Sequence, residues 1–224
     1  MRTLLQMLLT VSLIGLTALS AWSAPSFGGY TGLINVPNAD ALAPGAFNVG
    51  WVDGQLAGVD FNNFFINYGM PAAEKSNVEI GVNVMDMEGS DKDTLLNAKW
   101  AVKPETEAQM GISVGVIDAT NMNETTLYFV GSKVLTKGPF KVFGGEILNP
   151  RISIGLGGGG LDGLFAGLTA GLGNSLALMA EYDSNDVNLG ARLRLYKGIA
   201  VQANWLDIGG EDDLGIGVYY SASR

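Results

Sequence analysis

From Gly45 onward, apolar residues alternate with small or polar residues in short segments that turn residues separate. Alternation with a period of two is typical of a strand whose two faces meet different surroundings. Twelve strands are predicted, and Phe140 to Ile147 is interpreted as a bulged beginning of the seventh. They span 46–53, 59–68, 77–85, 94–102, 107–117, 125–135, 150–157, 163–172, 175–183, 187–195, 198–206 and 213–221. The pattern predicts an all-β fold of about twelve antiparallel strands, within a range of roughly ten to fourteen.

The composition of the two faces decides between a soluble sheet and a membrane barrel. In residues 77–84, valine and isoleucine alternate with asparagine, glutamate and glycine, and other segments repeat this contrast. The solvent face of a soluble sandwich would be rich in lysine, glutamate and threonine, whereas the lumen face of a barrel is small and polar. We therefore expect an antiparallel transmembrane β-barrel of the outer-membrane type, with outer-membrane lipid against its apolar face.

Two sets of side chains follow from this choice of faces. Leu189, Leu193 and Leu195 should meet lipid, and the residues between them should point inward. We expect the lumen to be lined by Glu79, Lys99, Glu181, Arg192, Arg194 and Gln202. We expect an aromatic girdle near the strand ends, formed by Trp51, Tyr68, Trp100, Tyr182, Trp205 and Tyr220.

The chain divides into three parts. Residues 1–23 have a basic residue, an apolar run and small residues before the expected cut, which predicts a cleaved signal peptide and export to the bacterial outer membrane. Residues 24–44 are rich in glycine and proline, so a long helix or a central strand is excluded there. These residues are a candidate lumen plug, and residues 45–224 are the predicted barrel.

The loops predict different chemistry at the two ends of the barrel. Alternate connections are acidic, and the others are shorter and near neutral. The acidic residues are Asp86, Glu88, Asp91, Asp93, Asp118, Glu124, Asp183, Asp186, Asp207, Glu211 and Asp212. Longer loops face outward in bacterial barrels, so the acidic end is expected outside the cell.

Composition removes several functions. The 224 residues include no histidine and no cysteine, so Ser-His-Asp hydrolysis, cysteine nucleophiles and histidine-bound zinc are excluded, and we expect no enzyme, cofactor or metal. A net charge of −9 makes nucleic acid an unsuitable partner.

Two glycine patterns have local explanations. Gly155, Gly157 and Gly160 satisfy a dinucleotide-binding pattern, but no helix that could hold a pyrophosphate follows them. The spacing of Gly163, Gly167 and Gly171 places all three on the lumen face, where they would leave room for something inside the barrel.

Two stretches resemble a known family. "GGYTGLINVPNADALAPGAF" (28–47) resembles the N-terminal motif of YjbH-like outer-membrane proteins, and "DGLFAGL" (162–168) with "LALMAEYDSNDVNLGARLRL" (176–195) resembles their later strands. The resemblance implies an outer-membrane barrel associated with exopolysaccharide or capsule production, with polysaccharide and cell-envelope export proteins as partners. Better-known members are longer and several carry lipid, whereas this chain has room for one barrel and has no cysteine.

Two functional hypotheses result. The first is a pore or accessory protein in exopolysaccharide production or export. The second is a non-conducting structural or adhesive barrel in which residues 24–44 fill the lumen.

Overall fold

A computed structural model describes residues 24–56, 58–73, 75–136, 138–142, 145–173 and 175–223. The signal peptide predicted for 1–23 lies outside these residues. The strands are β1 (Phe47–Leu56), β2 (Val59–Pro71), β3 (Asn77–Met87), β4 (Asp93–Lys103), β5 (Gly111–Ile117), β6 (Thr126–Val134), β7 (Phe140–Val142), β8 (Gly145–Gly158), β9 (Gly163–Leu172), β10 (Leu176–Tyr182), β11 (Val187–Tyr196), β12 (Ile199–Leu206) and β13 (Asp213–Ala222). Within the described part of the chain, no helix is long and apolar enough to cross a bilayer.

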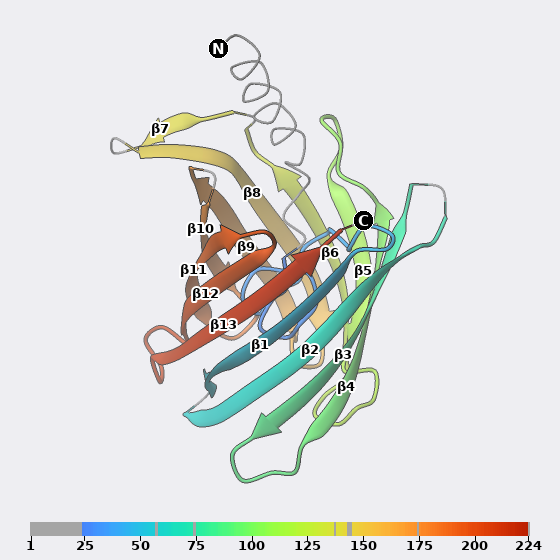
Figure 1. Ribbon diagram of the computed structural model, residues 1–224, viewed down its shortest axis with the longest axis vertical. Helices are drawn as coiled ribbons and strands as arrows, with labels where there is room; N and C mark the ends of the chain where they lie inside the picture. Colours follow the sequence, from blue (N-terminus) through green and yellow to red (C-terminus); the bar gives the residue numbers. More distant parts are fainter. Residues whose placement is uncertain are drawn as a thin grey trace, which may run out of the picture.

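Twelve of these strands form one closed antiparallel barrel (Figure 1). From β1 to β6 and from β8 to β13 each strand pairs with the next, β1 pairs with β13, and β6 pairs directly with β8, so that β7 lies outside the ring of strands. Closure satisfies the main-chain hydrogen bonds of both edge strands, which an open sheet in lipid would leave unpaired. The predicted fold class is therefore confirmed.

The structure corrects two details of the predicted strands. Phe140 to Ile147 is a hairpin, because β7 pairs with the first residues of β8, and only β8 continues into the barrel. A register shift between Leu148 and Arg151 marks the bulge on the β9 side of β8. The predicted strand 107–117 begins only at Gly111, because the Thr106 N–H bonds the Gln109 carbonyl 3.0 Å away and turns the chain there.

The two faces of the wall differ as the alternation predicts. In β2, buried and exposed residues alternate over most of the strand, and β13 shows the same pattern. Side chains such as Val82, Leu189 and Val218 are large, apolar and exposed on the outside. Soluble proteins rarely carry so extensive an apolar surface, whereas lipid requires one. The molecule is an outer-membrane type β-barrel.

Candidate functional site: the filled lumen

Residues 24–44 lie inside the barrel (Figure 1, blue). Phe27, Leu33, Ile34 and Val36 are all at most 3% exposed. The segment folds back on itself through bridges that pair Pro25 with Thr31 and Gly32 with Pro37, so it is a compact double loop. Its proline and glycine content rules out helix and long strand, and the main chain must find hydrogen-bond partners on the barrel wall.

Glu181 on β10 binds three consecutive amides of this segment. Its carboxylate accepts hydrogen bonds from the N–H groups of Ile34 (3.0 Å), Asn35 (2.6 Å) and Val36 (3.2 Å). The Asn188 amide donates a fourth bond over 3.2 Å, and Glu181 as a residue is 4% exposed. Hydrogen bonds to an ionised group are about twice as strong as neutral ones, so this carboxylate is the principal anchor of the 34–36 turn.

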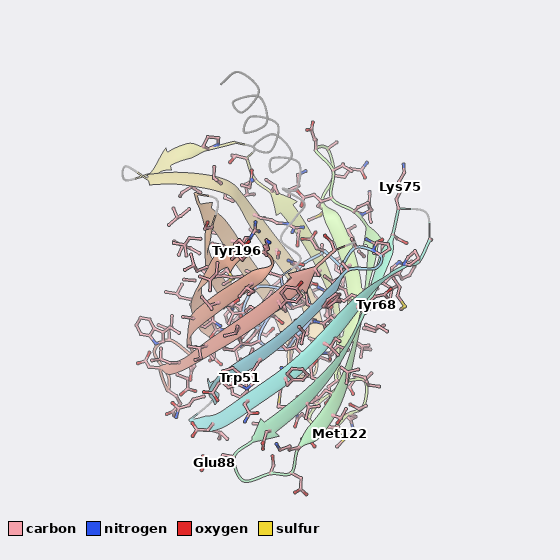
Figure 2. All side chains as sticks on the ribbon, in the orientation of Figure 1. Trp51, Tyr68, Lys75, Glu88, Met122 and Tyr196 are labelled. Carbon is pink, nitrogen blue, oxygen red and sulfur yellow. The ribbon has the colours of Figure 1, made fainter. Side chains whose placement is uncertain are left out.

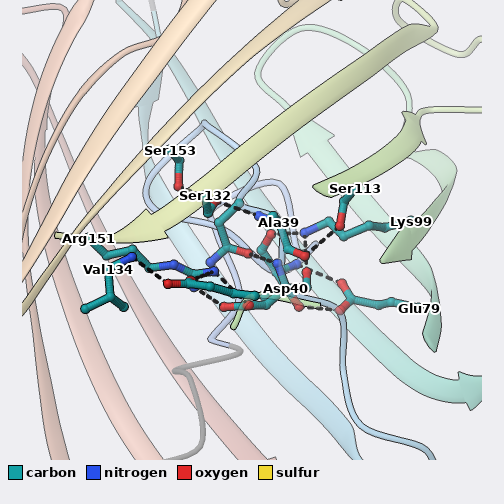
Figure 3. A network of polar contacts seen from close by, with 12 residues as sticks. Ala39, Asp40, Glu79, Lys99, Ser113, Ser132, Val134, Arg151 and Ser153 are labelled. Atoms are coloured by element: carbon teal, nitrogen blue, oxygen red, sulfur yellow. Dashed lines mark hydrogen bonds and ion pairs between the residues drawn. The ribbon is translucent and has the colours of Figure 1, made fainter. Parts of the chain in front are cut away.

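A second polar cluster holds the other part of the segment (Figure 3). Glu79 on β3 accepts hydrogen bonds from the N–H groups of Thr31 (2.7 Å) and Leu42 (3.0 Å), and also from the Thr31 hydroxyl. Lys99 on β4 donates to the carbonyl of Thr31 and, over 3.1 Å, to that of Asp40. Glu79 and Lys99 lie opposite each other across the β3–β4 ladder, and both are 2% exposed.

The same cluster contains an ion pair that the sequence analysis missed. Arg151 on β8 donates through both terminal guanidinium nitrogens to the two oxygens of the Asp40 carboxylate. Its Nη2 atom also lies 3.1 Å from a carboxylate oxygen of Glu105. The face on which Arg151 lies could be predicted from the sequence, because Arg151, Ser153, Gly155 and Gly157 are two residues apart and share the face of small residues. Its partner could not be read, since Asp40 belongs to a segment without any periodicity.

Arg192 and Gln202 form a third point of attachment. The Arg192 guanidinium donates to the carbonyls of Pro25 (2.8 Å) and Leu33 (2.9 Å) and to the Gln202 side chain (2.6 Å). It also lies 5.8 Å from the centre of the Tyr219 ring. Arg194 lies two residues further along β11, so the alternation assigns it to the same face, but it is exposed near the end of the strand. Five of the six candidate lumen residues are thus buried, and Arg194 is not.

Asparagine side chains of the wall donate hydrogen bonds to the main-chain carbonyls of residues 27–29. Asn63 donates to the Phe27 carbonyl over 2.8 Å, and Asn83 and Asn97 both donate to that of Gly28, over 2.6 and 3.2 Å. Asn67 donates to the Gly29 carbonyl. None of these asparagines was among the six candidate lumen residues, although Asn83 belongs to the polar face predicted in residues 77–84. The alternation was enough to assign a face, but it gave no sign of a bound segment.

Glycines in the wall make room for the apolar side chains of the segment. A β-carbon placed at Gly167 would lie 2.5 Å from the Leu33 side chain, and one at Gly190 would lie 3.0 Å from Ile34. A β-carbon at Gly215 would collide with the Phe27 ring. The expectation that a glycine on the lumen face leaves room for an internal element is met at Gly167. At Gly171 the neighbour is instead Leu148, and at Gly163 the space is empty.

The six candidate girdle aromatics all lie on the outer surface, between 41% and 47% exposed. Trp51 and Tyr68 appear at different levels of the barrel in Figure 2, and Trp51 occupies the middle of β1. Trp205 donates its indole N–H to Asp212 over 3.1 Å at the acidic end. Exposure on this face suits contact with lipid, and the girdle itself stays a prediction.

The acidic residues lie in the loops that join β3 to β4, β5 to β6, β10 to β11 and β12 to β13, at one end of the barrel. Burial acts to raise the pKa of Asp118, but hydrogen bonds from the Thr120 hydroxyl and from nearby backbone N–H groups outweigh it, and the pKa lies below its usual value. The pKa of Asp186 is raised by burial and by the charges of Asp207 and Asp183. Within the described ranges no group of three or more acidic, histidine or cysteine side chains is arranged to hold a metal ion.

The chain is similar to solved barrels of the bacterial outer membrane. It resembles an outer membrane channel from Pseudomonas putida F1 with 11% identity and a TM-score of 0.46, over 85% of this chain and all of that one. It also resembles outer membrane phospholipase A from Escherichia coli with 10% identity and a TM-score of 0.41, over 80% of this chain and 93% of that one. No protein-family model matches the sequence, and no curated protein matches it either.

Proposed function

We propose that this protein is an outer-membrane pore or accessory protein of exopolysaccharide production or export, closed at rest by residues 24–44. One observation carries the proposal. The two most distinctive stretches of the YjbH-like resemblance, "TGLINVPNA" and "AEYDSNDVNLG", contact each other inside the barrel. Glu181 from the second stretch binds the 34–36 turn of the first, and Asn35 donates to Asp183 over 3.0 Å. The residues that carry the resemblance therefore form one structural unit, the segment and its receptor.

The lumen supports transport of a polar, flexible molecule once the segment has moved. Without residues 24–44, the wall would present asparagine, serine and glutamine side chains together with Glu79, Lys99, Glu181 and Arg192. Such a lining hydrogen-bonds hydroxyl groups and water, and charges in a wet lumen select among solutes. Polysaccharide and envelope export proteins are the partners that belong to this proposal.

Conductance and polysaccharide yield test the proposal together. The full-length barrel and a variant lacking residues 25–44 are compared in planar bilayers, and exopolysaccharide is measured in cells that carry either form or neither. We expect low conductance from the full-length protein, higher conductance from the variant, and reduced polysaccharide in cells without the gene. Equal conductance from a correctly folded variant would refute closure by the segment, and unchanged polysaccharide would refute the pathway.

A non-conducting structural or adhesive barrel is the second candidate. The depth of burial of the segment favours it, because Ile34 and Val36 are fully buried and Phe27, Leu33 and Ile34 belong to one core cluster with strand residues. Under this proposal the segment is a permanent core, and the acidic loops are the contact surface. A full-length barrel that never conducts under any applied potential, but supports adhesion, would establish it.

Absence of enzymatic activity remains a prediction. The chain contains no histidine to act as a base, although one solved neighbour is a phospholipase. Incubation of the purified protein with phospholipid vesicles should release no fatty acid, and hydrolysis would overturn this expectation.

A further inference from the structure

We infer that the barrel lumen is a polypeptide-binding site and that residues 24–44 are its reversible ligand, recognised mainly through the main chain. The inference rests on the proposed function in one respect, which is that the segment closes the lumen. It goes further by assigning the closed state to a binding equilibrium with a defined recognition chemistry.

The wall contacts the main chain of the segment at both its donors and its acceptors. Glu79 and Glu181 accept from amides, and Arg192, Lys99 and four asparagines donate to carbonyls. Ser113 donates to the Ala39 carbonyl over 2.6 Å, and Ser132 accepts from the Ala39 N–H over 2.9 Å. Side chains of the segment join the polar contacts chiefly at Thr31, Asn35 and Asp40. A main chain held in this way is bound as a peptide ligand is bound.

The apolar contacts add shape to this recognition. Phe27 and Leu33 occupy spaces that Gly215 and Gly167 leave free, and Ile34 shares the space at Gly190 with the Asn204 side chain. Each space lies on a different strand (β13, β9 and β11), so the set fixes the position and orientation of the loop. A small residue opposite a large one is the complementarity expected of an anchor and its pocket.

One position in the segment excludes side chains. Gly29 has a φ of +86°, and a β-carbon there would lie 2.9 Å from both the Phe65 ring and the Asn83 amide. Any other residue is strained in that backbone conformation and is also obstructed by the wall. A variant of the peptide at this position is therefore a specific probe of the site. Ala43, by contrast, is exposed where the segment leaves the lumen, so a change there should be silent.

The connection between segment and barrel offers a place to separate them. Ala43 and Pro44 are both exposed, so a site-specific protease sequence can be inserted between them in the full chain. Conductance is recorded before cutting, after cutting, and after a wash in mild urea. Synthetic peptide 24–44 is then added, and its binding is read separately by the fluorescence anisotropy of a labelled copy.

The expected results are a rise in conductance when the cut segment leaves and a return to the closed level when the peptide is added. A Gly29→Val peptide should bind about tenfold or more weakly, because of the strain at this residue. An Ala43→Val peptide should bind like the wild type. If conductance rises after cutting but no peptide rebinds, the inference is wrong and closure by the segment stands. If the segment leaves and conductance does not change, the closed-pore proposal fails instead.

Hydrogen exchange on the uncut protein gives a second test that does not depend on the insertion. Reversible binding predicts that the amides of Ile34, Asn35 and Val36 exchange together, and faster than those of β10. Exchange of these amides at the same rate as the barrel strands would show a permanently fixed core and would refute a reversible ligand.

Discussion

Replacement of Glu181 by glutamine should loosen the segment by a calculable amount. One carboxylate oxygen accepts from Ile34 and Val36, and the other accepts from Asn35 and the Asn188 side chain. Whichever oxygen becomes the NH2 group, two N–H donors lose their acceptor. A buried donor left unpaired costs about 1–3 kcal/mol, so the two together cost about 2–6 kcal/mol. Removal of a buried charge offsets part of this cost, and we expect a net loss of about 2 kcal/mol.

Hydrogen exchange at the three amides of residues 34–36 measures this loss directly. A destabilisation of about 2 kcal/mol should speed their exchange about 30-fold. The matched control is Glu88→Gln in the exposed β3–β4 loop, where the same change of charge should leave the segment amides unaffected. Exchange within about twofold of the wild type in Glu181→Gln would refute the role of this carboxylate as the anchor.

Three further predictions follow from other parts of the barrel. Gly167→Leu should crowd Leu33 and destabilise the folded protein by about 1–3 kcal/mol in urea unfolding, whereas Gly158→Ala, with nothing within 4 Å of its β-carbon, should not; equal midpoints would contradict the pocket. Val82→Arg on the exposed apolar face should cost about 2–4 kcal/mol in lipid vesicles if it lies near the bilayer midplane, and a neutral result would argue against a lipid-facing surface. Because the pKa of Asp118 is lowered in the folded protein, its contribution to stability is complete above the usual carboxyl pKa and is lost as the pH falls below it. Exchange in residues 118–125 should therefore increase on acidification in the wild type, and this pH dependence should be absent in Asp118→Asn.

The alternation of residues was sufficient to predict the wall of the barrel. A strand has a side-chain period of two, so the face that meets lipid and the face that meets the lumen can be assigned without any knowledge of the partners. That is why Glu79, Lys99, Glu181, Arg192 and Gln202 were placed on the inner face, and why Leu189 was placed in lipid. The ends of strands were less certain, as the hairpin at β7 shows, because turn residues bound a strand only loosely.

The occupant of the lumen could be suspected from the sequence, but its contacts could not. Glycine and proline in residues 24–44 exclude helix and central strand, which left an internal plug as the candidate role of the segment. The contacts between Glu181 and the 34–36 turn, and between Arg151 and Asp40, join residues more than one hundred positions apart. A segment without periodicity carries no signal for its partners.

The sequence by itself determined that this chain forms an all-β barrel wall with an apolar outside and a small, polar inside, because local alternation is enough to specify two faces. Only the tertiary structure decided what the polar inside contacts. Closing the barrel brings distant carboxylates, amides and glycines around one loop, and the main chain of that loop then satisfies buried charges that would otherwise need water.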